Sequence, residues 1–141
     1  MGGASRRPRV AGYLGTLGIM PIVTVEVVVD LDRTLNLDLA QSLANAIGRA
    51  LASPPGQTWV RLNVLGRNAY AENECVVNAD ALPVFVTVLK RQVPLGAELL
   101  AEVAALTQAI AQVVARPVQC VHVEYAAAAV NRLAFGGKLV Q

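Results

Sequence analysis

The residue with the clearest chemical potential is Pro21, which directly follows Met20 and opens a run of β-branched residues. If translation began at Met20 and that methionine were removed, Pro21 would carry a free secondary amine. An α-amino group has an unperturbed pKa of about 8, and burial lowers the pKa of a cationic amine further. Because a general base works best with a pKa near the operating pH, a chain that begins at Pro21 would hold a rigid, neutral base. In a longer chain the same nitrogen is an amide without basicity.

A purely structural interpretation of Pro21 stands beside the catalytic one. Val, Ile and Thr favour a pleated backbone, so residues 21–29 are predicted to form a strand. Proline is tolerated at the first residue of a strand, where its missing N–H removes no ladder hydrogen bond. The residue pattern alone therefore leaves Pro21 open as either a strand opener or a base.

The composition of the 141-residue chain predicts one domain with a real core. Hydrophobic residues make up 55% of the chain, mostly as Ala, Val and Leu. We find no stretch approaching the roughly 20 consecutive apolar residues that a membrane-spanning helix needs. The sequence thus predicts a soluble chain without a membrane partner, and the apolar excess predicts contacts between subunits.

The distribution of charge argues against a nucleic-acid partner. Arg6, Arg7 and Arg9 are the only charged residues among the first twenty, and the rest of the chain carries nine basic and ten acidic residues. A near-neutral domain lacks the basic footprint that binds phosphates. Cys75 and Cys120 show neither metal-ligand nor redox spacing, which predicts no metal site and favours a reducing, cytoplasmic location.

Residues 1–20 are predicted to be an extension outside the fold, and residues 21–141 the domain. The extension lacks a long apolar segment followed by a small-residue cleavage site, so a secretory signal is not expected. An organelle-targeting peptide, a misassigned start codon and a disordered tail remain alternatives for it.

The first half of the domain has the pattern of a βαβ unit. After the first strand, apolar residues at helical spacing predict an amphipathic helix over residues 38–52, with Thr34 or Asn36 as its cap. The Ser-Pro-Pro-Gly sequence that follows stops the helix. Alternating apolar residues then predict a strand over residues 58–65. A unit of this size implies a parallel strand pair with a right-handed crossover.

The second half repeats this pattern. Residues 83–89 form another proline-led, valine-rich strand, residues 97–115 a second helix, and residues 118–125 a fourth strand. The paired glycines in the tail, residues 126–141, permit a tight turn or hairpin.

Two tandem βαβ repeats, residues 21–66 and 83–126, predict an α/β domain. Its four-stranded mixed sheet would carry both helices on one face. The other face needs a cover, which we expect to come from further subunits. The alternation along the strands places polar side chains on that bare face: Thr24, Glu26, Arg61, Asn63, His122 and Glu124.

Taken together, these features resemble the tautomerase superfamily. The Met20-to-Val25 opening and the repeated βαβ unit carry this resemblance. The overall length and the closing segment from Val121 through Lys138 are most similar to the branch of macrophage migration inhibitory factor. The strand segment Thr58–Arg61 looks more like 4-oxalocrotonate tautomerase. The resemblance spans residues 21–141 and implies a homotrimer whose amino-terminal proline moves a proton between an enol and its ketone, without a cofactor.

The resemblance also implies roles for particular residues. Pro21 matches the catalytic proline, and Arg61 matches an arginine that stabilises a developing enolate or grips a carboxylate. Further positions match those that line the substrate pocket: Tyr70, Lys90, Arg91, His122 and Glu124. Two departures stand against a full transfer. The pocket lysine found after the first helix in the inhibitory-factor branch is replaced here by Ser53 or its neighbours, and the CxxC motif of that branch is absent.

Each site candidate also has a structural interpretation. Arg61 would pair with Glu26 or Glu124 on the same sheet face, and His122 would be an ordinary strand histidine. At the level of function, the leading hypothesis is an isomerase acting on a small keto–enol acid through Pro21. The alternatives are a non-catalytic trimeric binding or scaffold protein of the same fold, and a hydrolytic dehalogenase that uses the same proline.

Overall fold

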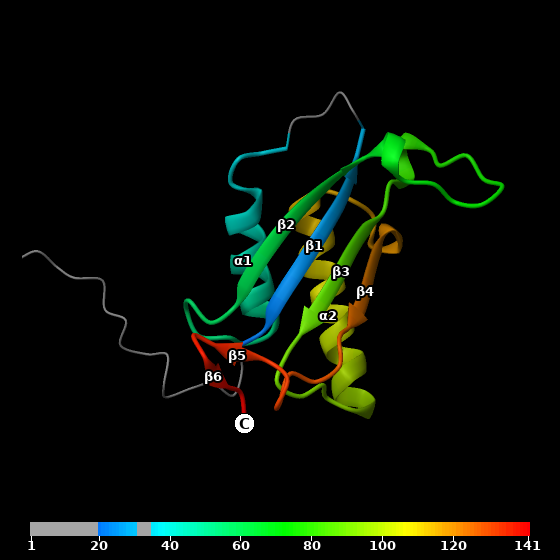
Figure 1. Ribbon diagram of the computed structural model, residues 1–141. Helices are drawn as coiled ribbons and strands as arrows, with labels where there is room; N and C mark the ends of the chain where they lie inside the picture. Colours follow the sequence, from blue (N-terminus) through cyan, green and yellow to red (C-terminus); the bar gives the residue numbers. More distant parts are fainter. Residues whose placement is uncertain (1–19, 31–34) are drawn as a thin grey trace, which may run out of the picture.

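The computed structural model describes residues 20–30 and 35–141, and its centre is a four-stranded sheet (Figure 1). The strands are β1 (Ile22–Val29), β2 (Trp59–Gly66), β3 (Val84–Leu89) and β4 (Val121–Tyr125), in the spatial order β2-β1-β3-β4. β1 runs parallel to β2 and β3 runs parallel to β4, whereas β1 and β3 are antiparallel. Two βαβ halves thus meet at the centre of one mixed sheet, as the repeated sequence pattern predicted.

Both helices cover the same face of this sheet (Figure 1). They are α1 (Leu39–Ala50) and α2 (Gly96–Val114), and they pack against each other as well as on the strands. Alternate residues of β1 point into the layer between, so that Val23, Val25 and Val27 are almost fully buried. Leu43 of α1 and Leu106 of α2 meet them there with no exposed surface. The predicted two-layer architecture is confirmed.

The element boundaries differ from the predicted ones at several ends. α1 begins at Leu39 with Asp38 as its cap residue, and no side chain caps it. Asn36 lies just before the helix, where its Oδ1 accepts the Asp38 amide at 3.1 Å. The other proposed cap, Thr34, lies outside the described residues. The fourth strand starts three residues later than predicted, because Val118–Cys120 form a short 3-10 turn, η3.

Helix α2 corrects one expectation from composition. By its 19-residue length and its hydropathy, it could cross a membrane, although we found no such stretch in the sequence. In the structure α2 lies along the sheet and buries Leu106, Ile110 and Ala111 against it. Its apolar character thus serves packing on one side, while Leu100 on the other side is 73% exposed.

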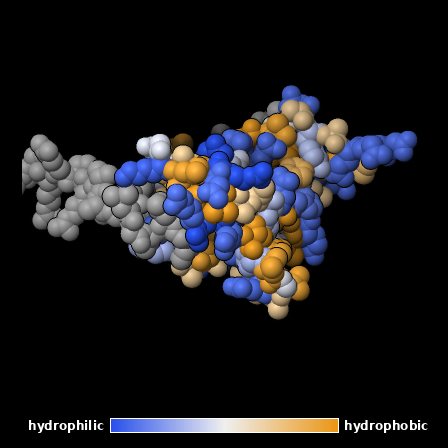
Figure 2. All heavy atoms as spheres, turned by 60° about the horizontal axis from the view of Figure 1, so that its bottom comes forward, coloured by the Kyte–Doolittle hydropathy of each residue, from blue (hydrophilic) through white to orange (hydrophobic). Residues whose placement is uncertain are grey.

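The two connections outside the βαβ units have distinct shapes. After η1 (Arg67–Ala69), a hydrophilic loop projects from the body before the chain returns through η2 (Ala79–Ala81) (Figures 1 and 2). The tail forms a small hairpin of β5 (Ala134–Phe135) and β6 (Lys138–Leu139) beside the start of β1 (Figure 1). Glycines at the hairpin turn have φ values of 55° and 86°, which explains why a Gly-Gly pair stands there.

The face of the sheet opposite the helices is polar and aromatic. One cross-strand row joins Arg61, Thr24, Thr87 and Glu124, because these residues are aligned in register from β2 to β4. The next row joins Asn63, Glu26, Phe85 and His122 in the same way. The predicted bare face is therefore present, and within the described chain no helix covers it.

Candidate active site

Pro21 lies immediately before β1, with its side chain fully buried. Its carbonyl oxygen accepts a hydrogen bond from the Trp59 amide at 3.0 Å, which extends the β1–β2 ladder by one step. Met20 is also buried, with 6% of its surface exposed. In the full chain the proline nitrogen is part of the peptide bond to Met20, so it has no lone pair available for proton transfer.

Lys90, at the end of β3, lies at the same end of the sheet as Pro21, because Ile22 pairs with Leu89. Its Nζ forms an ion pair with Glu102 Oε1 at 2.6 Å, and both side chains are only 15% exposed. The other carboxylate oxygen of Glu102 accepts a hydrogen bond from the Tyr125 hydroxyl at 2.7 Å. Lys90 is thus held by a partly buried cluster, Lys90–Glu102–Tyr125, rather than presented to a ligand.

The environment of Tyr125 favours the protonated form of its hydroxyl. Burial raises the pKa of Tyr125, and the hydrogen bond to Glu102 and the negative charge of that carboxylate raise it further. The phenol therefore stays protonated and donates to the carboxylate. We infer that the cluster ties the ends of β3 and β4 to α2.

Arg91, the second predicted cation at this end, also has a protein partner. Its Nε donates to the main-chain oxygen of Gln141 at 2.7 Å, and its own carbonyl accepts the Val130 amide at 3.3 Å. These bonds hold the tail against the end of β3. Neither Lys90 nor Arg91 is thus a free pocket cation in the single chain.

Arg61 and Glu124 lie in the same row of the bare face but on opposite edge strands. Arg61 Nη2 donates to Thr24 Oγ1 at 3.2 Å, and Thr87 Oγ1 donates to Glu124 Oε1 at 2.9 Å. Three strand spacings of about 4.8 Å separate the two edge strands. The suggested pairing of Arg61 with Glu26 or Glu124 is not found among the described residues. Arg61 instead donates its hydrogen bond to the Thr24 hydroxyl.

Tyr70 and His122 lie further along the sheet, away from Pro21. Their rings pack on either side of Phe85, with ring-centre distances of 5.9 Å and 5.6 Å. The Tyr70 hydroxyl donates to Glu72 Oε2 at 2.9 Å, and the pKa of Tyr70 is raised, first by burial and then by that carboxylate. His122 is exposed, as a residue of an uncovered face would be.

One chain therefore does not gather the predicted site residues at one point. Lys90 and Arg91 share the end of the sheet with Pro21. Tyr70 and His122 lie further along the strands from Pro21, on either side of Phe85. Arg61 and Glu124 occupy opposite edges of the sheet.

Sequence reasoning missed two aromatic residues near Pro21. Trp59 lies beside Pro21, because its amide donates a hydrogen bond to the Pro21 carbonyl. The Phe135 ring packs edge-on against the Trp59 ring, with 5.2 Å between the ring centres. Trp59 was visible in the sequence as the first apolar residue of the second strand. Phe135 carried no such signal, because only the path of the tail hairpin brings it there.

The architecture matches solved structures closely in shape and weakly in sequence. A fused 4-oxalocrotonate tautomerase, F6, superimposes with a TM-score of 0.64 at 21% identity, covering 82% of this chain and 94% of that one. A macrophage migration inhibitory factor-like protein from Entamoeba histolytica gives 0.64 at 9% identity over 85% and 98% of the two chains. The chain has the tautomerase fold.

A third neighbour is the protein Pt0534, whose structure was solved after inactivation by 2-oxo-3-pentynoate. It has a TM-score of 0.64 and 16% identity, covering 84% of this chain and 94% of that one. No family model matches the sequence. No curated protein matches it either. At these low sequence identities, the comparisons show that this chain shares the tautomerase fold with these proteins.

Proposed function

We propose that this protein is a tautomerase when its mature chain begins at Pro21. The free secondary amine would act as general base on a small 2-oxo or 2-hydroxy-enoic acid, taking a proton from one position and returning it at another. The observation that carries the proposal is the position of Pro21, at the start of the first strand of a tautomerase fold. Burial at that position would keep the amine neutral near pH 7.

We also propose that the working unit is a homotrimer. The fused 4-oxalocrotonate tautomerase F6 is described as an asymmetric trimer. In this chain the uncovered sheet face and the separation of the predicted site residues both favour such an assembly. A neighbouring subunit would cover the bare face and could bring its own His122 and Glu124 to the end of the sheet that holds Pro21.

Arg61 would hold the substrate's carboxylate or stabilise the enolate. Its single described partner is the neutral Thr24 hydroxyl, so its positive charge is not cancelled by a carboxylate. A guanidinium in this state keeps further N–H donors for a bidentate grip on an anion. Lys90, by contrast, is neutralised by Glu102 and would act as a structural residue.

The experiment compares two chains that differ only in their starting point. A chain beginning at Pro21 and a chain beginning at Met1 are assayed with phenylenolpyruvate and with 2-hydroxymuconate, with Pro21→Ala as the control. The shorter chain should be active, and the other two should lose activity. Arg61→Ala in the shorter chain should lower kcat/KM by about 10²–10³, as loss of an anion-stabilising donor does. Unchanged turnover by Pro21→Ala would remove the proline from the mechanism.

A non-catalytic binding protein of the same fold is the second candidate. The observation that favours it is the buried Met20–Pro21 bond, which leaves the nitrogen as an amide. The intact mass of natively expressed protein separates the two candidates. A chain starting at Pro21 favours the isomerase, and one that retains the residues before Pro21 favours the binding protein.

A further inference from the structure

The outward side of α2 carries almost no charge. Its exposed residues are Gly96, Ala97, Glu98, Leu100, Ala101, Ala104, Ala105, Gln108 and Gln112. Glu98 is therefore the only charged residue among the exposed positions of this fully described helix. A surface helix usually places charged and polar residues opposite its buried stripe. In α2 that position is held mostly by alanine and by the exposed Leu100.

The first repeat offers an internal comparison. α1 covers the same face of the sheet, and its exposed residues are all polar: Gln41, Ser42, Asn45 and Arg49. The two helices thus have similar buried sides and different outward sides. The proposed trimer covers the opposite face of the sheet, so it leaves the outward side of α2 uncovered. An exposed apolar surface of this kind indicates a further contact.

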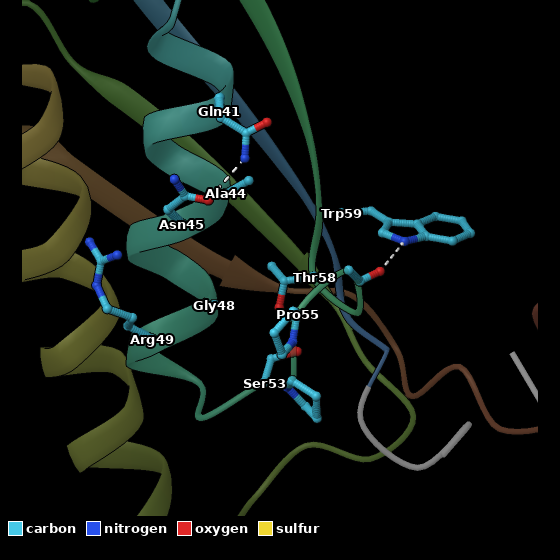
Figure 3. A pocket seen from close by; sticks show the side chains of 11 residues that line it. Gln41, Ala44, Asn45, Gly48, Arg49, Ser53, Pro55, Thr58 and Trp59 are labelled. Carbon is cyan, nitrogen blue, oxygen red and sulfur yellow. Dashed lines mark hydrogen bonds between the residues drawn. The ribbon is translucent and has the colours of Figure 1, made fainter. Parts of the chain in front are cut away.

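Two charged residues of opposite sign border the outward side of α2. Glu98 is exposed in the first turn, and seven residues make about two turns, so it lies on the same flank as Ala105. Arg49 of α1 points toward that flank (Figure 3) and lines a hollow of about 750 Å³ together with Ala105 and Gln108. Within the described chain, neither Glu98 nor Arg49 forms an ion pair.

A second copy of the chain fits this side when its α2 runs antiparallel across a two-fold axis. With the axis between Ala101 and Ala104, Ala101 of each copy faces Ala104 of the other. In the same register Ala97 faces Gln108. These four positions are four, three and four residues apart, which is the spacing of a seam between two packed helices. Alanines at its centre allow the two helices to approach closely.

The same axis pairs the groups on both flanks of the seam. Glu98 of one copy reaches the level of Thr107 of the other, where Arg49 of that copy lies beside α2. Opposite charges therefore meet twice, once on each side of the axis. Leu100 lies about 200° around the helix from Glu98, on the other flank. A two-fold axis sets equal flanks side by side, so the two Leu100 side chains meet there.

The charge of this side selects a second copy over other occupants. Anionic lipid surfaces and nucleic acids attract helices that carry several Lys or Arg residues, and α2 contains none. We propose that α2 packs against α2 of a second copy, with Glu98–Arg49 pairs on one flank and a Leu100–Leu100 contact on the other. A seam one helix wide is smaller than the roughly 800 Å² per partner of a standard interface, so the pairing depends on concentration.

The first test follows the pairing by sedimentation velocity of the full chain from about 1 µM to about 1 mM, the range over which weak contacts saturate. The average mass should rise toward twice its value at low concentration. Glu98→Lys should weaken the pairing at least about tenfold, because like charges then meet, and Glu98→Lys/Arg49→Glu should restore it. Glu74→Lys makes the same change of charge in the projecting loop and should pair as the wild type does.

The second test reports the register of the seam. In a Cys75→Ser background, Ala101→Cys lies close to its own copy across the axis, within the range of a disulfide. Mild oxidation should therefore cross-link it between chains. Ser42→Cys is exposed on α1, far from the axis, and serves as the matched control that should stay reduced.

Three outcomes would overturn the proposal. They are a mass that does not change with concentration, a Glu98→Lys/Arg49→Glu variant that pairs no better than Glu98→Lys, and equal cross-linking of the two cysteine variants. Binding to neutral phosphatidylcholine vesicles without self-association, lost in Leu100→Ser, would assign this side to a lipid surface instead and would also contradict the proposal.

Discussion

The partly buried Lys90–Glu102–Tyr125 cluster allows a quantitative test of how the end of the sheet is held. Lys90→Met removes the cation and leaves the Glu102 carboxylate with one neutral partner, Tyr125. Breaking a buried ion pair on one side costs about 3–5 kcal/mol. Because both side chains retain 15% exposure, we expect a loss at or just below the lower end of this range, about 2–3 kcal/mol in the free energy of unfolding.

Two companion variants separate the charge from the packing. Lys90→Met/Glu102→Gln removes both charges but keeps a partner for the Tyr125 hydroxyl, so it should recover at least half of the loss. Arg91→Met changes the adjacent residue, which donates to a main-chain oxygen and forms no ion pair within the described chain. It should cost about 1 kcal/mol, the value of one hydrogen bond.

The assay is urea unfolding followed by circular dichroism, at one protomer concentration for all variants because assembly shifts apparent stability. A loss below about 0.5 kcal/mol for Lys90→Met, typical of an exposed pair, would refute the assignment of Lys90 to a partly buried structural cluster. So would a double variant less stable than Lys90→Met alone. In either case Lys90 would return as a candidate for substrate binding.

Two further predictions concern alkaline pH and assembly. The raised pKa of Tyr125 stabilises the fold below the ordinary tyrosine pKa of 10.0, and this contribution is lost as the pH rises above that value, because the unfolded chain ionises first. The free energy of unfolding of the wild type should therefore decline between pH 9 and 11, and Tyr125→Phe should flatten this decline. Equal declines of the two proteins in unfolding experiments over that range would contradict the prediction. Phe85→Lys places a charge in the middle of the bare sheet face, so light scattering should report a trimer for the wild type and smaller species for the variant, and a variant that remains trimeric would contradict the assignment of this face to an interface.

The sequence predicted the layers of the fold because hydrophobic periodicity carries that information. The valines of β1 alternate, and the apolar stripes of both helices share one face, so a single arrangement buries them all. The polar bare face followed from the same alternation, and register confirmed it down to the row that joins Arg61 and Glu124.

Contacts between polar residues that are distant in the sequence could not be predicted from sequence patterns. Nothing in the spacing of Lys90, Glu102 and Tyr125 indicates that three separate elements end at one point, and only the packing of α2 across the sheet brings them together. The same holds for Arg61, whose suggested acidic partners lie on the correct face while the nearer Thr24 hydroxyl takes its hydrogen bond. Phe135 reaches Trp59 only through the path of the tail hairpin.

The most direct measurement of the central claim is chemical labelling of Pro21. 2-Oxo-3-pentynoate, the reagent that inactivates Pt0534, has an electrophilic alkyne to which a free amine can add, its proton moving to the adjacent carbon. Peptide mass spectrometry should find the full mass of the reagent on Pro21 in a chain that begins there, with parallel loss of tautomerase activity, and no adduct at Pro21 in the chain that begins at Met1. Labelling elsewhere, or inactivation of both chains alike, would contradict a free proline amine as the base.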